Sequence, residues 1–451
     1  MLNIVISILG ILITILLIVG IHESGHFFVA KLLGIKVLRF SIGFGKPLLK
    51  WQDKKGTEYT ISAIPLGGYV KMLDETEDVV PANERHYAFN NQPYLKKMAV
   101  IAAGPLSNLI FAFLIYWALF MVGFTSIAPI IGKVEPHSIA AEAKVIPQQQ
   151  IISVDGKPTH NWISVIVDLL SRSGDTDYLK IQTKDQQTQQ TQIYLLNLAH
   201  WHMEDLKPDP LASLGITPFE PEIPAVIYEI LPDSPAAHAG LQVGDKITAI
   251  QHQPIADYFA AADLIVKHPK ENLVFTIQRQ QKTLDIPVTI GSKSNGFFSQ
   301  RGYLGISPHI ELPKNLLRHN KYGAIESLSH AWADVSTFSR LNFIILGKMV
   351  TGKISLKSLG GPITIFQSAG TALNNGLIAF VSFLAFLSIS IGIINIIPIP
   401  GLDGGHLLLQ TIEAITRHPI SQKTQLLAFR LGLIFLLLIM FQSLINDILR
   451  L

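Results

Sequence analysis

The chain has 451 residues, of which 49% are hydrophobic and only 15% are charged, against roughly 25% charged residues in soluble domains. This shortage of charge indicates a membrane protein, and the formal net charge of +3 is too small to indicate a nucleic-acid partner. Because the sequence contains no cysteine, disulfides and thiolate ligands are excluded, and any bound zinc must be held by His, Asp or Glu.

Four long uncharged runs predict transmembrane helices, because about 20 apolar helical residues cross a hydrocarbon core of roughly 30 Å. A cleaved signal peptide over the first run is disfavoured, since no basic segment precedes it and no small-x-small site ends it. The fourth run is the shortest, so its helix has the least defined ends. We expect the helices near residues 4–27, 99–123, 374–397 and 427–446.

The basic residues predict how these helices are oriented. Lys and Arg gather between residues 31 and 97 and in the predicted loop 404–426, whereas none precedes the first helix. Short cytoplasmic loops carry such an excess. We therefore expect both termini, and the segment between the second and third helices, on the outer side of the bacterial inner membrane, which is the periplasm in a Gram-negative cell.

The first uncharged run ends in Ile-His-Glu-Ser-Gly-His at residues 21–26. His22 and His26 are four apart, so a helix places both imidazoles on one face. This H-E-x-x-H spacing predicts two zinc ligands, with Glu23 as general base. Ionisable side chains inside a membrane helix are costly and usually functional. The alternative interpretation is that His22 and Glu23 only mark the helix end at the interface.

Residues 35–73 predict a β-hairpin next to the membrane, with partly alternating strands and a turn at residues 53–56. The edge of such a hairpin could receive an extended peptide as an added strand. A peripheral hairpin on the membrane surface is the equally favoured alternative.

Residues 125–310 contain an internal repeat. Residues 134–143 match residues 230–239 (an offset of 96), and Leu214-Gly215-Ile216 match Leu304-Gly305-Ile306 (an offset of 90). Such consistent offsets predict tandem domains, here β-rich and placed at 125–220 and 221–310. The pattern Ser-Pro-Ala-x-x-Ala-Gly-Leu-x-x-Gly-Asp at residues 234–245 resembles PDZ domains. The Leu-Gly-Ile segments resemble their carboxylate-binding loop. The first copy lacks the glycine-rich turn.

Two further features lie after the repeats: a connector at residues 311–370 and the end of the third uncharged run. Trp332, Val335 and Phe338 have a partly helical spacing that predicts an amphipathic interfacial helix. The third run then ends in Asn-Ile-Ile-Pro-Ile-Pro-Gly-Leu-Asp-Gly-Gly-His at residues 395–406. Prolines and glycines at membrane depth are tolerated around a cavity or inside protein.

Asp403 is therefore a candidate third zinc ligand, because the predicted topology places it towards the cytoplasmic side, at the depth of His26. The alternative is a loop aspartate at a helix terminus. His406 could orient a ligand from outside the metal, but an ordinary loop histidine is the favoured interpretation.

H-E-x-x-H in a first transmembrane helix, with Asn-x-x-Pro-x-Pro-x-Leu-Asp-Gly in a late one, resembles the site-2 protease family of intramembrane zinc metalloproteases. The paired PDZ pattern narrows the resemblance to the bacterial RseP type (regulator of sigma-E protease). Three shorter segments also support the resemblance to this family: Gly43-Phe44-Gly45, residues 67–72 and residues 104–108.

The resemblance implies one zinc ion per chain, held by His22, His26 and Asp403, with Glu23 as general base and Asn395 as a donor to substrate or oxyanion. The substrates it implies are single-span membrane proteins, such as anti-sigma factors and remnant signal peptides, which the PDZ domains would gate by size. Membrane lipid is the other expected partner. The expected substrate-binding residues besides Asn395 are Gly43, Phe44, Gly45, Tyr69, Pro398 and Pro400.

The expected fold class is a polytopic α-helical membrane protein with four transmembrane helices, a membrane-associated β-hairpin and two extracytoplasmic PDZ domains. Two other functions compete with proteolysis. One is a non-catalytic scaffold that binds peptide termini through its PDZ domains, and the other is a metal transporter, which would need neither Glu23 nor external PDZ domains. The sequence predicts no oligomeric state. The expected divisions are 1–124, 125–220, 221–310, 311–370 and 371–451.

Overall fold

The computed structural model describes residues 2–76, 79–221, 223–295, 299–308, 313 and 316–450. These residues form two compact units. The smaller unit comprises residues 130–133 and 218–318, and the larger unit comprises the rest. The larger unit contains all of the long helices.

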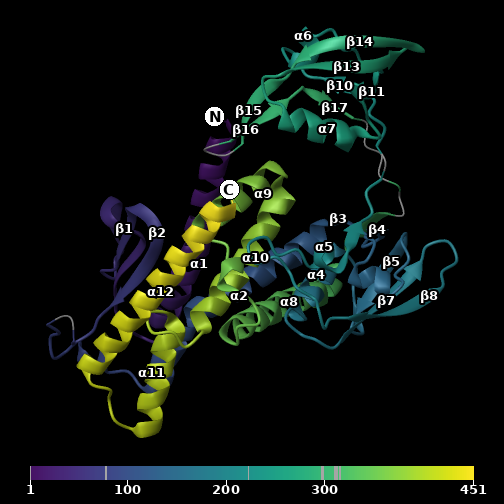
Figure 1. Cartoon of the computed structure of the whole chain (residues 1–451). Helices are drawn as coiled ribbons and strands as arrows, with labels where there is room; N and C mark the ends of the chain where they lie inside the picture. The colour runs from purple at the N-terminus through teal and green to yellow at the C-terminus, as the bar shows by residue number, and fades with distance from the viewer. Residues whose placement is uncertain are drawn as a thin grey trace. The chain divides into compact units, whose positions relative to one another are not determined.

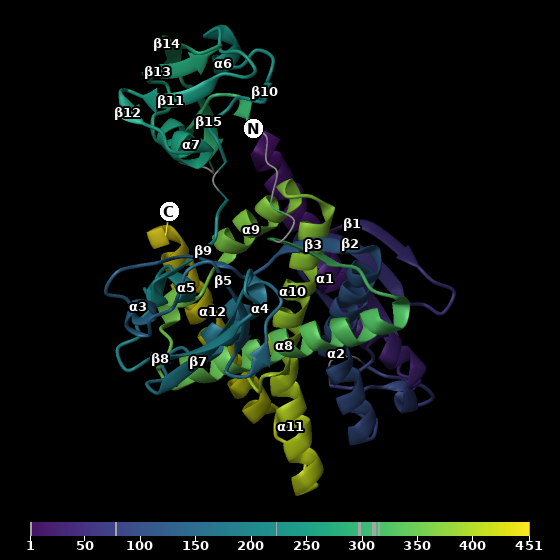
Figure 2. The ribbon, with the colours of Figure 1, turned by 90° about the vertical axis from the view of Figure 1, so that its right-hand side faces the viewer.

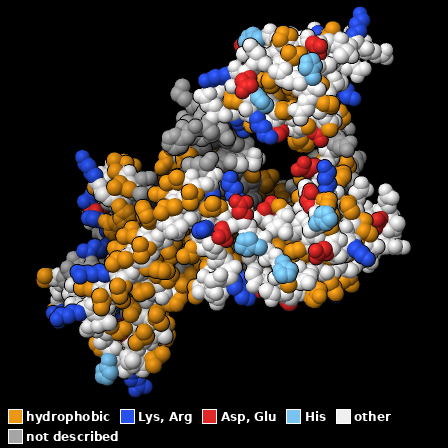
Figure 3. Space-filling model, viewed as in Figure 1, with side chains coloured by type: hydrophobic (Ala, Val, Ile, Leu, Met, Phe, Trp, Pro, Cys, Tyr) orange, Lys and Arg blue, Asp and Glu red, His pale blue; other side chains and the backbone are white. Residues whose placement is uncertain are grey.

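Among the described residues, four helices are long and apolar enough to cross a membrane. They are α1 (Leu2–Leu32), α2 (Tyr94–Val122), α10 (Leu377–Ile396) and α12 (Gln422–Arg450). This confirms the four predicted helices: α1 and α12 extend beyond both predicted ends and α2 begins before its predicted start, whereas α10 is shorter than predicted. Apolar side chains of α12, such as Leu438 and Phe441, are exposed, and Figure 3 shows hydrophobic side chains gathered over this helix. Such a surface suits hydrocarbon rather than water.

Helices α1 and α2 pack at very close range. A Cβ atom on Gly25 would lie 2.3 Å from the carbonyl oxygen of Ala103 and 2.7 Å from the hydroxyl of Ser107. That hydroxyl donates to the carbonyl of Ile21 at 2.9 Å. Small residues and side-chain hydrogen bonds are the usual means of joining membrane helices, because lipid provides no hydrophobic force between them.

The predicted hairpin is confirmed as β1 (Val37–Gln52) and β2 (Glu58–Met72), an antiparallel pair. Both strands are strongly curved, so the first part of β1 pairs with two different parts of β2. Ser41, for example, lies opposite Thr60 on one side and opposite Tyr69 on the other. The hairpin packs against the end of α1 through a core that contains Phe27, Val37 and Val100. It therefore lies beside the H-E-x-x-H segment, as Figure 1 shows.

The two repeats have the same sheet topology. The sheet order is β6-β5-β7-β8 in the first repeat and β12-β11-β13-β14 in the second, all antiparallel. Ser138 and Ser234 cap corresponding short helices, each accepting a backbone N–H at 3.2 Å. The first repeat contains α3 (Ile139–Glu142), β5 (Gln149–Val154), β6 (Lys157–Pro158), α4 (Trp162–Ser171), β7 (Tyr178–Asp185), β8 (Thr191–Asn197) and α5 (Pro210–Leu214). The second contains α6 (Pro235–His238), β11 (Lys246–Ile250), β12 (Gln253–Pro254), α7 (Tyr258–Lys267), β13 (Asn272–Arg279) and β14 (Lys282–Thr289).

The predicted connector contains a helix, α8 (Ala324–Val350), whose expected place at the membrane interface stays a prediction. It crosses α2 and α10, as Figure 2 shows. Phe338 stacks on Tyr116 of α2 with ring centroids 6.0 Å apart and meets Phe386 of α10 at 5.5 Å. Val335 and Ala331 are buried in the same cluster. The connector is thus part of the helical core of the larger unit.

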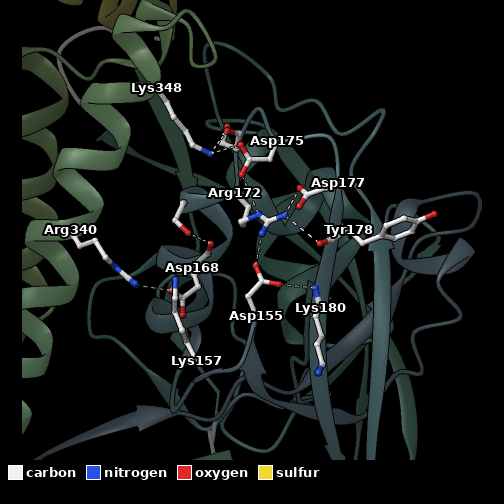
Figure 4. A network of polar contacts seen from close by, with 12 residues as sticks. Asp155, Lys157, Asp168, Arg172, Asp175, Asp177, Tyr178, Lys180, Arg340 and Lys348 are labelled. Carbon is white, nitrogen blue, oxygen red and sulfur yellow. Dashed lines mark hydrogen bonds and ion pairs between the residues drawn. The ribbon is translucent and has the colours of Figure 1, made fainter.

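The first repeat is attached to α8 by ion pairs, drawn in Figure 4. Asp168 of α4 lies 3.2 Å from Arg340, and Asp175, just after α4, lies 3.2 Å from both Lys348 and Lys353. Lys348 also donates to the carbonyl of Ser173 at 2.6 Å. We call this contact, formed by residues 168–175 with Arg340, Lys348 and Lys353, the α8 dock.

Outside the two repeats, two of the described α-helices were not predicted. The expected loop 404–426 contains α11 (Asp403–Thr416), and a separate helix, α9 (Pro362–Asn374), precedes α10. Neither helix stands out as a separate apolar run, because α11 is amphipathic and α9 is joined to α10 within one uncharged stretch. The backbone breaks at Gly376, which has φ +100°.

The remaining elements are short. They are η1 (Arg85–Tyr87), β3 (Phe124–Ile127), β4 (Ile131–Val134), β9 (Ile216–Pro218), β10 (Glu229–Ile230), β15 (Gly291–Asn295), β16 (Ser299–Tyr303), β17 (Ile306–Ser307), β18 (Leu317–Asn320) and η3 (Leu356–Ser358).

Candidate metal centre

Three predicted ligand residues meet in space although 377 positions separate Asp403 from His26 (403 − 26). His22 and His26 come from α1, and Asp403 is the first residue of α11. One ligand atom from each lies within 4.8 Å of the others. The Nε2 atoms of the two histidines are 3.3 Å apart, and Asp403 Oδ2 lies 3.0 Å from His22 Nε2 and 3.4 Å from His26 Nε2.

The orientation of His26 is fixed by α2. Its Nδ1 lies 2.8 Å from the carbonyl oxygen of Val100. A carbonyl can only accept, so Nδ1 carries the proton and the neutral ring presents a lone pair at Nε2. A Cβ on Gly104 would lie 2.2 Å from this same Nε2. Position 104 therefore requires glycine, because any side chain there would clash with the imidazole of His26.

Asp403 is positioned by the break between α10 and α11. Residues 397–402 leave the helical path after α10, and α11 restarts the helix at Asp403. A helix N-terminus favours a negative charge. The Nε2 atoms of His22 and His26 face the carboxylate of Asp403 at 3.0 and 3.4 Å. The site therefore presents a carboxylate anion to the two rings.

These three side chains fit a zinc ion. Oδ2 of Asp403 is buried and has no well-formed hydrogen bond among the described residues, although two imidazole nitrogens face it. Ligands bound about 2.0–2.1 Å from a tetrahedral zinc lie roughly 3.3 Å from one another, which matches the observed 3.0, 3.3 and 3.4 Å. Two imidazoles and one carboxylate leave a fourth position open, as catalytic zinc sites do.

Glu23 lies beside this cluster and is not one of its ligands. It is partly buried and faces the hairpin, since a Cβ on Gly68 of β2 would lie 2.8 Å from Glu23 Cγ. The hairpin therefore covers the general-base candidate from one side.

The other predicted substrate residues fall in two groups. Gly43, Phe44 and Gly45 of β1 lie near Tyr69 of β2, and the rings of Phe44 and Tyr69 stack with centroids 6.1 Å apart. Asn395 is in the last turn of α10, and Pro398 and Pro400 lie in the break before Asp403. The favoured interpretation of His406 as a loop histidine is wrong, because His406 lies in helix α11, where its side chain is exposed.

The glycine of each predicted peptide-binding segment has a positive φ. Gly215 and Gly305 have φ of +80° and +84°, and each lies against the capping serine of its repeat, Ser138 or Ser234. Leu214, Ile216 and Leu304 are buried, whereas Ile306 is only partly buried. The hydroxyl of Tyr258 donates to the carbonyl of Ile306 at 3.2 Å.

Sequence reasoning assigned no role to Asn108 of α2, whose side chain is completely buried. Its Nδ2 lies 3.4 Å from His22 Nδ1. The sequence did contain a signal for this residue. An amide side chain inside an uncharged membrane run is costly unless it has a hydrogen-bond partner. The Val100 carbonyl, by contrast, is a backbone group and leaves no trace in the sequence.

Comparison with known proteins is consistent with this geometry. Residues 10–439 match the profile of Peptidase family M50. The chain is 41% identical over 445 residues to the "Regulator of sigma-E protease RseP" of Salmonella typhimurium (strain 14028s / SGSC 2262) and to that of Escherichia coli (strain K12), covering 98% of this chain and 97% of each relative. A "Putative zinc metalloprotease" of Vibrio cholerae is 37% identical over 436 residues, 96% of both chains.

Proposed function

The chain belongs to peptidase family M50 and is a zinc metalloprotease, and on this premise we propose that it cleaves peptide bonds within the membrane through a site made of His22, His26, Asp403 and Glu23. The observation that carries the proposal is the convergence of two α1 histidines and the α11 aspartate within 4.8 Å. These ligands lie on or beside helices that are able to cross a membrane, which supports cleavage of a substrate within the membrane.

The chain's own residues have separate tasks in this mechanism. His22, His26 and Asp403 hold the zinc ion, which when bound supplies Lewis-acid chemistry that favours deprotonation of water and polarises a carbonyl. Glu23 takes the proton of the attacking water as the new C–O bond forms. It then passes a proton to the amide nitrogen as the C–N bond breaks. The amide of Asn395 is proposed to donate to the carbonyl oxygen of the substrate.

The hairpin is proposed to hold the substrate. A transmembrane helix hides its amides in internal hydrogen bonds, so it must unwind before cleavage. An extended segment can then pair with a strand edge. Gly43, Phe44, Gly45 and Tyr69 lie in the two strands and Pro398 and Pro400 in the break beside Asp403, which supports their role in guiding that segment.

The repeats are proposed to be PDZ domains that gate substrates by size on the periplasmic side, with Leu214, Gly215 and Ile216, and Leu304, Gly305 and Ile306, as peptide-binding loops. The relatives are named regulators of sigma-E, so we extend the proposal to a bacterial inner-membrane protease whose substrates are single-span proteins such as an anti-sigma factor and remnant signal peptides. Family membership disfavours the scaffold and transporter alternatives.

The direct test replaces Glu23 by Gln and measures cleavage of a single-span substrate by purified protein in lipid. Loss of the general base should lower the cleavage rate by about 10²- to 10⁴-fold, while zinc content stays at the wild-type level because Glu23 is not a ligand. The matched control is Glu84→Gln, which removes a carboxylate paired with Lys36 on the surface. Wild-type cleavage by Glu23→Gln would refute the mechanism.

A further inference from the structure

Asn108 stands out because it is the buried polar side chain nearest to the site that the mechanism does not use. It lies in the middle of α2 with an exposed fraction of 0%. Its Nδ2 faces His22 Nδ1 at 3.4 Å, and its Oδ1 is buried without a hydrogen-bond partner among the residues that the structure describes. A buried amide oxygen without a partner is costly, and in a native protein it requires an explanation.

The proton on His22 provides that explanation. His22 directs Nε2 towards Asp403 and His26, so a metal-binding His22 needs its lone pair there and its proton on Nδ1. A proton on Nδ1 requires an acceptor, which an amide NH₂ group cannot be. Rotating the Asn108 amide by half a turn exchanges two groups of nearly equal size. The oxygen then accepts from His22 Nδ1, and the unpartnered acceptor disappears.

The two histidines are then held in the same way from α2. His26 donates from Nδ1 to the backbone carbonyl of Val100 at 2.8 Å, and His22 donates from Nδ1 to the side chain of Asn108. The first acceptor is a backbone group of α2, and the second is a side chain eight residues further along the same helix. Such partners of metal-binding histidines fix the ring orientation and the tautomer.

We propose that Asn108 is a positioning residue whose side-chain oxygen accepts a hydrogen bond from the Nδ1–H of His22 and so fixes the tautomer in which Nε2 binds zinc. The inference rests on the proposed ligand role of His22. It assigns Asn108 no contact with zinc or substrate. Its effect on catalysis passes entirely through the orientation and basicity of His22.

Helix α10 holds Asn108 in position for this role. The hydroxyl of Ser388 on α10 donates to the backbone carbonyl of Asn108 at 2.9 Å. A Cβ on Gly392, one turn further along α10, would lie 3.3 Å from Asn108 Cβ. Helix α10 thus packs directly against the backbone and Cβ of Asn108 and fixes the point from which its side chain extends.

The test compares two nearly isosteric variants by their zinc affinity, measured by competition with a chelator on the purified full chain. Asn108→Leu removes the acceptor and should weaken zinc binding about 10- to 100-fold. Asn108→Asp keeps an acceptor at the same place and should bind zinc within a few-fold of wild type. Thr14→Ala is the packing control, because it removes a buried hydroxyl that donates within α1 to the carbonyl of Gly10 at 2.7 Å, and its zinc affinity should be unchanged.

The outcomes separate this inference from the proposed site. If Asn108→Leu binds zinc as wild type does while His22→Ala loses it, Asn108 has no positioning role and the site stands. If His22→Ala keeps full zinc content, the proposed site itself is wrong. If Asn108→Leu fails to fold, the folded Asn108→Asp protein decides, since an affinity reduced 10-fold or more despite the retained acceptor contradicts the inference.

Discussion

The contact between α1 and α2 has neither charge nor spare volume, whereas the first repeat meets α8 through ion pairs at the surface. In the first contact, Cβ positions on Gly25 and Gly104 would lie 2.3 and 2.2 Å from atoms of the other helix. In the α8 dock, the side chains of Arg340 and Lys353 are 44% and 49% exposed. Each exposed pair of this kind contributes about 0–1 kcal/mol and is screened by salt.

The close packing of α1 on α2 and the exposed ion pairs of the α8 dock differ because the two contacts position different things. A metal site tolerates misplacement of its ligands only within a fraction of an ångström, and an error of about 1 Å can cost 100-fold in rate. Backbone-to-backbone packing supplies that accuracy. The dock holds a domain that carries none of the proposed catalytic residues, and flexible charged side chains are sufficient for that. Substitutions should therefore affect chemistry at the first contact and domain attachment at the second.

The largest effect is expected for Gly104→Ala. Its new methyl group would occupy the place of His26 Nε2, 2.2 Å away, so the ring must turn from the site and lose its bond to Val100. Zinc content should fall to a small fraction of wild type, and cleavage should drop by about 100-fold or more. Zinc analysis of the purified protein and a cleavage assay with a single-span substrate check this.

The control for Gly104→Ala is Gly347→Ala on α8, where a Cβ would meet nothing within 4 Å. Alanine in an open helical position stabilises by at most about 1 kcal/mol, so zinc content and cleavage should match wild type. Equal losses in both variants would mean that helix backbone effects, rather than the close approach to His26, are responsible.

A small, pH-dependent effect is expected for Asp175→Asn in the dock. Burial opposes ionisation of Asp175, but hydrogen bonds from Lys348 and Lys353 outweigh it, so its pKa lies below the ordinary value. The carboxylate faces Arg172, Lys348 and Lys353. A lowered pKa means that its contribution to stability is complete above about pH 4 and is lost as pH falls through the lowered value.

The measurement is the thermal unfolding of wild type and Asp175→Asn between pH 3 and 7. Wild type should be more stable near neutral pH, by about 1 kcal/mol or less at low salt. That advantage should shrink at high salt and as the pH falls towards 3. Cleavage of a small single-span substrate should be unchanged. A stability difference that grows on acidification would contradict the lowered pKa of Asp175.

The sequence was most informative where chemistry demands particular residues at particular spacings. The helices, the hairpin and the repeats follow from apolar runs, alternation and matched segments, and His22, His26 and Asp403 follow from two short motifs that the structure brings together. The partners of the histidines could not be predicted, because the pairing of α1 with α2 selects Val100 and Asn108 from many equivalent positions. Helix α11 was missed because the segment between the third and fourth apolar runs was interpreted as a loop, although its amphipathic spacing is typical of a helix.

The central claim is that Asp403 completes a zinc site begun by His22 and His26, and zinc analysis of Asp403→Asn tests it most directly. Asparagine has nearly the same shape but lacks the anionic oxygen that lies 3.0 Å from His22 Nε2. Asp263→Asn, on the surface of α7, serves as the matched control. We predict about one zinc ion per chain in wild type and control and a small fraction of that in Asp403→Asn; undiminished zinc in Asp403→Asn would contradict the account.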